Sequence, residues 1–257
     1  MNKKSRYQLL TGIVLALAGI VFTVLTRSAG IPKDAPASSK MVFALSLILT
    51  LIGIVVTLAA LLPQRRTTDV RTLTMAALFA ALCYIGFTYF RIDIPVGTEK
   101  TAFHLGNVFC VLAALFLGGM WGGMAGAVGM TLADLTTAYV TSAPKTFLLK
   151  LCIGLITGFV AHRIFHLSRD TERKASLPAA TLISCAAGMA FNIVADPLVG
   201  YFYKTYVLGV PQEFAKVWAK MGAVTTAVNA VIAVICAAAF YLALRPALKK
   251  SRLLPEI

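Results

Sequence analysis

Three ionisable residues lie inside stretches of this sequence that are otherwise apolar enough for a lipid bilayer. Asp134 and Lys150 fall within a glycine-rich double span at 103–150, and Asp196 falls within a later apolar run. A charge near the bilayer centre costs about 2.5 to 3.5 kcal/mol on insertion scales. Such residues usually pair with one another, carry a proton or line a path for a polar ligand. They are therefore the first candidates for function.

Other polar residues fall at a similar depth when each span is followed from its end. His104 and Asn107 begin one span, and Glu99 lies in the loop before it. Asn192 lies one helical turn from Asp196 on the same face. Convergence of polar groups from at least four spans predicts a single pocket that opens to the outside. The predicted substrate-binding residues are Glu99, His104, Asn107, Asp134, Lys150, Asn192 and Asp196.

Simpler interpretations of these residues stay open. Lys150 could form a neutralising pair with Asp134 or with Asp196 that only fixes helix register. His104 and Glu99 could be solvated residues at a loop end, as such types usually are.

Composition places the candidates in an integral membrane protein, because 59% of the 257 residues are hydrophobic and only 13% are charged. An apolar run of about 20 residues can cross a hydrocarbon core of about 30 Å as a helix. The sequence predicts an all-α fold with eight such runs, at 9–25, 41–62, 73–90, 103–117, 120–139, 147–165, 178–201 and 217–244.

The chain divides into two predicted parts. Residues 1–66 form an accessory transmembrane hairpin of two helices without a buried charge, and residues 67–257 form a six-helix membrane domain with every polar candidate. An alternative for residues 1–30 is a cleaved signal peptide, since a basic start precedes the first apolar run. Arg27 immediately before Ser28 makes a poor cleavage site and favours a membrane anchor.

Basic residues predict the orientation. With the amino terminus inside, 14 of the 24 Lys and Arg residues fall on the cytoplasmic side and 9 fall outside, which leaves Lys150 within a span. The prediction is a multi-pass protein of the cell membrane with both termini in the cytoplasm. The net charge of +14 then reflects topology and affinity for anionic lipid head groups, and no nucleic-acid partner is expected.

Small residues indicate how the helices pack. Gly118, Gly122 and Gly126 recur every four residues and favour close backbone approach between helices. Alanines repeat in the same way at 76–81 and could serve either internal packing or a second membrane subunit. Asn192 and Asn229 could also form hydrogen bonds that only hold helices together, and Asn229, which lies deeper, is the weaker candidate for the site.

No metal, cofactor or catalytic residue is predicted. The five cysteines lie singly in separate apolar spans, without the spacing of a metal site. His162 and His166 are four residues apart, but a zinc site would need further ligands. The sequence holds no glycine-rich phosphate loop of the GxxxxGK[ST] type, so ATP would have to be used by other proteins.

An ordered series of short segments between residues 71 and 166 resembles the substrate-binding S components of energy-coupling-factor (ECF) vitamin transporters, in the branch with riboflavin-type components. The segments are TMAALFAA (74–81), IPVG (94–97), FHLGNV (103–108), LGGMWGG (117–123), TLADL (131–135) and APKTFLLK (143–150). The amino-terminal hairpin departs from the six-helix family core.

The resemblance implies a six-helix bundle that captures a vitamin or related small molecule at the outer face and topples in the membrane to release it inward. It also implies three partner chains, a transmembrane scaffold subunit and two ATPase subunits. The helix face that meets the scaffold in the family corresponds here to Ala76, Ala77, Ala80 and Ala81.

Two other classes of function stay open. A stand-alone secondary transporter would use Asp134 or Asp196 to carry a coupled proton, and an intramembrane enzyme would use the same two carboxylates as acid and base. The ligand is not identified. Lys150 with Lys145 nearby favours an anionic or carbonyl-rich molecule, and a flat heterocycle would suit the aromatic residues Tyr84, Tyr89, Phe90, Tyr139, Tyr201 and Tyr203.

Overall fold

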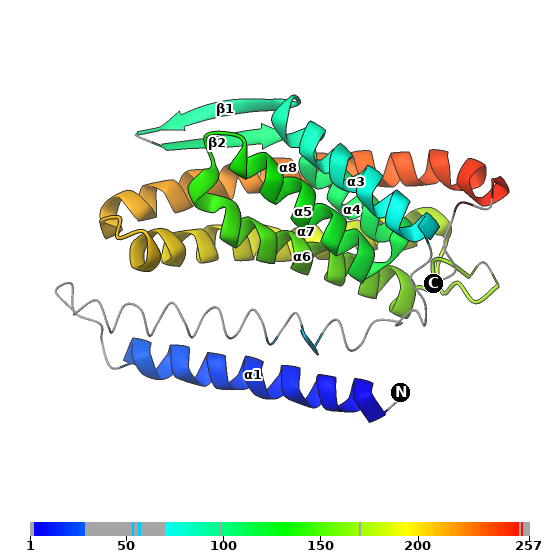
Figure 1. Ribbon diagram of the computed structural model, residues 1–257, viewed down its shortest axis with the longest axis horizontal. Helices are drawn as coiled ribbons and strands as arrows, with labels where there is room; N and C mark the ends of the chain where they lie inside the picture. The colour runs from blue at the N-terminus through cyan, green and yellow to red at the C-terminus, as the bar shows by residue number, and fades with distance from the viewer. Residues whose placement is uncertain are drawn as a thin grey trace.

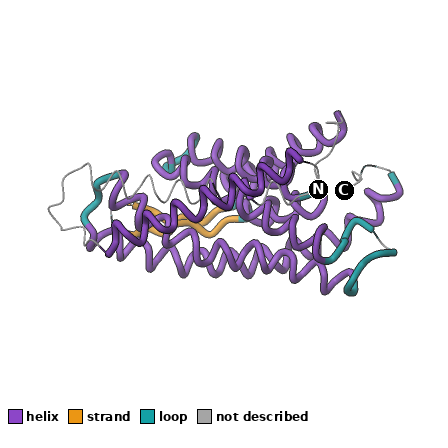
Figure 2. The backbone as a smooth tube through the Cα atoms, turned by 90° about the horizontal axis from the view of Figure 1, so that it is seen from below, coloured by secondary structure: helices purple, strands orange, loops and turns teal. Residues whose placement is uncertain are grey.

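In a computed structural model of the chain, the described residues are 3–28, 53, 56–57, 70–97, 99–169, 171–251 and 253. Helices make up most of this part and run side by side along the long axis of the molecule (Figures 1 and 2). They are α1 (Lys3–Ser28), α3 (Val70–Thr88), α4 (Gly106–Leu117), α5 (Gly119–Leu135), α6 (Ala143–Phe159), α7 (Leu177–Phe202) and α8 (Gln212–Lys250). A 3-10 turn, η1 (Val140–Ser142), precedes α6, and the π-helical turns η2 (Val160–Ile164) and η3 (Tyr203–Val207) continue α6 and α7.

The predicted all-α membrane fold is confirmed. Four helical runs of the described residues are long and apolar enough to cross a membrane: Val70–Thr88, Val140–Ile164, Leu177–Val207 and Gln212–Lys250. The first predicted span lies within α1. The second, at 41–62, lies outside the described residues except for three helical positions, so the division into hairpin and domain stays a prediction.

Two predicted spans correspond to shorter helices, α5 with 17 residues and α4 with 12. Every residue of α4 except Phe109 is buried. A helix that is enclosed by protein on all sides has no lipid face to match to the bilayer, so α4 need not have membrane length.

The glycines of α5 allow this enclosure. A Cβ atom at Gly122 would collide with the backbone of Ala114 in α4, and one at Gly129 would collide with the carbonyl of Ala80 in α3. On the other side, a Cβ atom at Gly154 of α6 would collide with the backbone of Gly123. The glycine repeat therefore serves packing within the bundle.

A β-hairpin replaces the loop that was predicted before the fourth span. Strands β1 (Arg91–Val96) and β2 (Glu99–His104) pair antiparallel, with Arg91 opposite His104, and Gly97 takes a positive φ of 63° at the turn. The prediction that a helix starts at residue 103 was wrong, because 103 and 104 belong to β2 and α4 begins at Gly106. Figure 1 shows the two strands lying along one side of the bundle.

Side chains of α8 hold this hairpin. The Asn229 carboxamide accepts a hydrogen bond from the His104 N–H at 3.0 Å and donates one to the Ala102 carbonyl at 2.9 Å. It thus satisfies the edge of β2 as a neighbouring strand would. A two-stranded hairpin alone is marginally stable, and this packing explains why a sequence without a clear strand pattern forms one here. Asn229 is therefore not the glue between helices that the sequence suggested.

Candidate functional site

A partly open cavity of about 140 Å³ lies between the hairpin and the helices. The helices α3 to α8 and both strands all contribute to its wall. Its polar lining residues are Lys100, Thr101, His104, Asn107, Asp134, Tyr139, Ser142, Lys145, Thr146, Lys150, Asn192, Asp196, Lys204, Trp218, Thr225, Thr226 and Asn229.

The structure brings most of the predicted substrate-binding residues to this cavity. Six of the seven line it: His104, Asn107, Asp134, Lys150, Asn192 and Asp196. The backbone of Glu99 belongs to β2, but its side chain lies outside the described part of the chain. Polar groups from separate spans thus converge on one place, and a role in binding stays a prediction for each of them.

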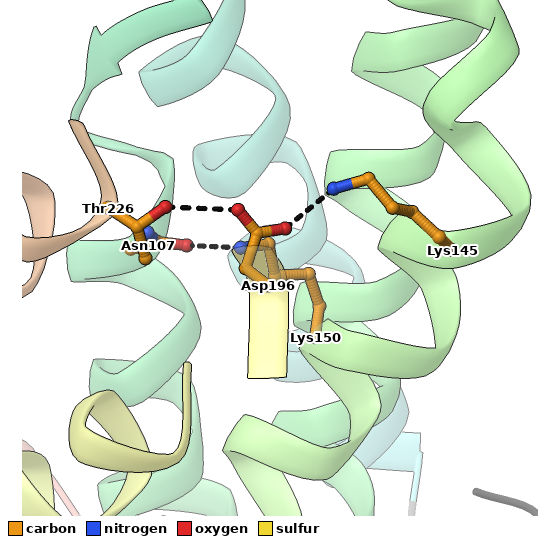
Figure 3. Close-up of polar contacts among 5 residues, drawn as sticks. All are labelled: Asn107, Lys145, Lys150, Asp196 and Thr226. Atoms are coloured by element: carbon orange, nitrogen blue, oxygen red, sulfur yellow. Dashed lines mark hydrogen bonds and ion pairs between the residues drawn. The ribbon is translucent and has the colours of Figure 1, made fainter. Parts of the chain in front are cut away.

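One ion pair crosses the cavity wall. Lys145 Nζ of α6 lies 2.6 Å from Asp196 Oδ1 of α7, and the Thr226 hydroxyl of α8 donates to Asp196 Oδ2 at 3.0 Å (Figure 3). The Asp196 carboxylate therefore joins three helices. The pairing of Asp196 with Lys150, one of the two sequence-based alternatives, was wrong, because Lys145 occupies that position.

Lys150 has a different partner. Its Nζ donates a hydrogen bond of 2.8 Å to Asn107 Oδ1 of α4, and the side chain is buried with 7% of its surface exposed (Figure 3). Among the described residues it forms no ion pair with a carboxylate. An ammonium group has three donors, and this contact uses one of them.

Asp134 and Asn192 contribute acceptors. The Thr146 side chain is hydrogen-bonded to the Asp134 carboxylate, whose Oδ2 is buried without a partner among the described residues. Asn192 Oδ1 is buried without a partner there as well. Buried polar atoms are nearly always hydrogen-bonded in folded proteins, so these oxygens are available for donors of a ligand.

Aromatic rings close one side of the cavity. The Phe87 ring lies 4.7 Å from the His104 ring and 5.4 Å from the Tyr139 ring, both edge to face. Burial, together with the charge of Lys150, lowers the pKa of His104 to about 3, so this imidazole is neutral at physiological pH. Among the six aromatic residues that the sequence suggested for a flat ligand, Tyr139 alone lines the cavity.

Tyr139 is itself fixed by the hairpin. Its hydroxyl donates to Asp93 Oδ1 at 3.0 Å, and Arg91 pairs with the same oxygen at 3.0 Å while lying over the Phe87 and Tyr139 rings. Burial raises the pKa of Tyr139, and the bond to Asp93 acts in the same direction. The hydroxyl therefore stays protonated and keeps the hairpin against the helices.

Trp218 of α8 connects the tip of the hairpin to the opposite wall. Its indole N–H donates to the Val96 carbonyl at 2.8 Å, and Lys204 Nζ lies 4.1 Å from the centre of its ring. A cation over an indole face is attracted by the ring quadrupole. This contact holds the Lys204 ammonium group at the cavity wall.

Sequence reasoning missed the contribution of α8. Trp218, Gly222, Thr225, Thr226 and Asn229 all line the cavity. Their spacing of three and four residues places them on one helical face, and this polar stripe within an otherwise apolar span was the signal that could have found them.

The four alanines of the predicted partner face do not share one environment. Ala76 is buried and Ala80 is half-buried against α5, whereas Ala77 and Ala81 are exposed. Neighbours in sequence lie about 100° apart around a helix, so one pair packs inside the bundle and the other faces outward. Ala76 is thus not accessible to a partner.

The two histidines near the end of α6 lie away from the cavity. His162 Nδ1 lies 2.9 Å from Ser168 Oγ and its Nε2 lies 3.2 Å from the Ala114 carbonyl. No group of three or more His, Cys, Asp or Glu residues in the described ranges is placed to hold a metal ion.

Comparisons with known proteins agree with this architecture. The model of the family "ECF-type riboflavin transporter, S component" matches residues 67–246, which include α3 to α7 and most of α8. No curated protein and no solved structure gives a match. The matched region covers well over half of the chain and contains every residue of the cavity wall, so the chain belongs to the family of ECF-type riboflavin transporter S components.

Proposed function

We propose that this chain, as the substrate-specific subunit of an ECF importer in the cell membrane, captures a vitamin or related small molecule in the cavity beneath the β1–β2 hairpin. The observation that carries the proposal is the polar wall inside an apolar bundle. Residues of the six helices α3 to α8 and of both strands line one small space there. Burial of so many polar groups is costly in a membrane protein unless a ligand uses them.

The family supports a transporter subunit rather than an enzyme. Energy for uptake then comes from partners, a transmembrane scaffold subunit and two ATPase subunits. With both termini in the cytoplasm, the cavity end of the bundle faces the outside. Ligand binding by the chain alone, and uptake only in the presence of the partners, are the two properties that this proposal requires.

Native mass spectrometry of the purified protein tests ligand capture. A small molecule bound in a one-to-one complex is expected in wild type and absent in the Asp134→Ala variant at equal folded yield. Retention of the molecule in that variant would exclude the cavity as its site.

Uptake experiments distinguish the importer from a secondary transporter. Vesicles that contain only this chain are expected to show no accumulation of the co-purified molecule, and addition of the scaffold and ATPase subunits with ATP should start it. Uptake by the chain alone that follows an imposed proton gradient would support the secondary transporter instead.

The exposed pair on α3 is the proposed contact with the scaffold subunit. Ala81→Leu, with Ala77→Leu, adds bulk where close helix approach is expected and should abolish ATP-dependent uptake while ligand binding persists. Ala239→Leu is a matched control, because Ala239 is an exposed alanine on α8. Equal uptake by all variants would place the scaffold elsewhere.

A further inference from the structure

The packing of α6 against α7 sets the depth of the polar residues in the cavity. Lys145 of α6 meets Asp196 of α7 in the ion pair at the cavity wall. Further inward, Gly188 of α7 lies against Thr157 of α6, since a Cβ atom at Gly188 would collide with the Thr157 hydroxyl. The two helices therefore run antiparallel, and position 150 of α6 lies level with position 192 of α7, about one helical turn inward of the ion pair.

The residues at this level form a polar floor. Lys150, Asn192 and Asn107 line the cavity and are only 7%, 1% and 2% exposed. Lys150 Nζ donates one hydrogen bond, to Asn107 Oδ1, and keeps two donors. Asn192 Oδ1 is buried without a hydrogen-bond partner among the described residues. The floor thus offers an N–H donor and a carbonyl acceptor at one depth.

A flavin carries the complementary pattern on one edge. Its pyrimidine ring presents two carbonyl oxygens with the N3–H group between them, whereas the opposite end of the ring system carries two methyl groups and no polar atom. The family to which the chain belongs is named for riboflavin. The cavity is partly open, so a ring system of this length can reach the floor with its polar edge and extend through the opening.

We infer that Lys150 and Asn192 are specificity-determining residues that bind the pyrimidine edge of a flavin, with Asn192 Oδ1 accepting the N3–H and Lys150 Nζ donating to the adjacent carbonyl. The inference rests on the proposed function and deepens it. The methyl-bearing end of the ring then points away from the floor. A second unpartnered oxygen, Asp134 Oδ2, lies beside Thr146, one turn outward of Lys150 on α6, and suits a hydroxyl group of the ribityl chain.

Three flavins test the inference. Riboflavin has the complete polar edge, 3-methylriboflavin has a methyl group in place of the N3 hydrogen, and 5-deazariboflavin keeps the edge but has a C–H group in place of N5. Isothermal titration calorimetry of the full chain in detergent measures the three dissociation constants. A buried acceptor that loses its donor is costly, so we expect 3-methylriboflavin to bind at least about tenfold more weakly than riboflavin. The affinity of 5-deazariboflavin should stay close to that of riboflavin.

Variants assign the effect to the two floor residues. Asn192→Ala should reduce the difference between riboflavin and 3-methylriboflavin to about twofold, because the acceptor is gone and the methyl group has room. Asn192→Asp keeps an acceptor oxygen and should keep most of the difference. Lys150→Met should weaken the binding of both flavins by about tenfold and leave their ratio unchanged.

Ser184→Ala is the matched control on the same helix. Ser184 is a buried polar residue of α7 outside the cavity wall, and its hydroxyl donates to the Ala180 carbonyl within the helix. This variant should bind all three flavins as wild type does.

Several outcomes would overturn the inference. Equal binding of riboflavin and 3-methylriboflavin would exclude recognition of the N3–H, and so would an equal loss of affinity with 5-deazariboflavin. A full difference in Asn192→Ala would exclude Asn192, and wild-type affinity in Lys150→Met would exclude Lys150. The three flavins compared on the unchanged protein decide the inference even if a variant does not fold. Absence of riboflavin binding would also overturn it, whereas the proposed function would fail only if native mass spectrometry found no bound molecule.

Discussion

Lys150 and His162 are two basic side chains on one helical run, α6 continued by η2, and both contact α4. They are equally buried, with 7% and 6% of their surfaces exposed. His162 has a partner for each ring nitrogen, the Ser168 hydroxyl and the Ala114 carbonyl, whereas Lys150 uses one of its three donors on Asn107.

This difference shows that burial alone does not identify a binding residue. His162 is satisfied by the protein and fastens the loop after α6 to α4, which is a structural role. Lys150 lies at a cavity wall and keeps donors for another molecule. The comparison can be tested by removing each group and measuring stability and ligand binding separately.

The largest loss of stability is expected at the ion pair beside Lys150. Asp196→Asn removes the only carboxylate paired with Lys145 among the described residues and leaves two lysines uncompensated at the cavity. Loss of one partner of a fully buried pair costs about 3 to 5 kcal/mol of unfolding free energy, and about 3 kcal/mol is expected for this half-buried pair, whose side chains are 14% and 24% exposed. The measurement is the thermal unfolding of the purified protein in detergent.

Two comparisons sharpen that experiment. Glu213→Gln breaks the exposed pair with Lys216, with exposures of 79% and 53%, and should cost less than about 1 kcal/mol. Lys145→Met combined with Asp196→Leu should regain most of the stability without regaining ligand binding. A single Asp196→Asn variant as stable as wild type would contradict a stabilising pair between Lys145 and Asp196.

The next largest effect is expected at the other end of the helical run. His162→Ala removes two hydrogen bonds and leaves a cavity, at a cost of about 2 to 3 kcal/mol, and the folded fraction should bind ligand as wild type does. Lys150→Met should show the reverse pattern, with little change in stability and weaker binding. If His162→Ala lost binding at full stability, the contrast between the two residues would be wrong.

A pH titration tests the neutral imidazole of the hairpin. Burial lowers the pKa of His104 to about 3, whereas the pKa in the unfolded chain is about 6.5. Between these values the unfolded chain binds a proton that the folded chain does not, so stability is highest above pH 6.5 and decreases as the pH falls. The loss at pH 5 is about 2 kcal/mol for this group.

His104→Gln provides the comparison, since it keeps a polar side chain without the titration. Its thermal midpoint between pH 7.5 and pH 5 should fall less than that of wild type. The same slope in both proteins would show that His104 is not buried in its neutral form.

The smallest effect is expected at the hairpin tip. Trp218→Phe removes the hydrogen bond to the Val96 carbonyl and should cost about 1 kcal/mol, together with faster hydrogen exchange at the amides of β1 and β2. Trp121→Phe is the control, because Trp121 lies outside the cavity wall. Unchanged exchange in Trp218→Phe would show that this bond does not hold the hairpin.

Much of the molecule could be predicted from sequence because lipid imposes strict rules. Long apolar runs must be helices, and ionisable residues within them must meet other polar groups. The sequence therefore predicts one cavity that is lined by His104, Asn107, Asp134, Lys150, Asn192 and Asp196. The glycine repeat at 118–126 likewise predicted close helix packing.

Only the tertiary structure determines which polar residues form hydrogen bonds or ion pairs with one another. Whether Lys145 or Lys150 meets Asp196 depends on the rotation and axial shift of α6 against α7, and spacing along the chain does not specify either. Spacing also does not specify which of the adjacent residues Ala76 and Ala77 is buried and which is exposed. Nor does it specify that Asn229 completes the edge of a hairpin that is stable only when packed on α8. The sequence by itself determined which residues must avoid lipid, and only the packed bundle determined which of them satisfy one another and which keep atoms for a ligand.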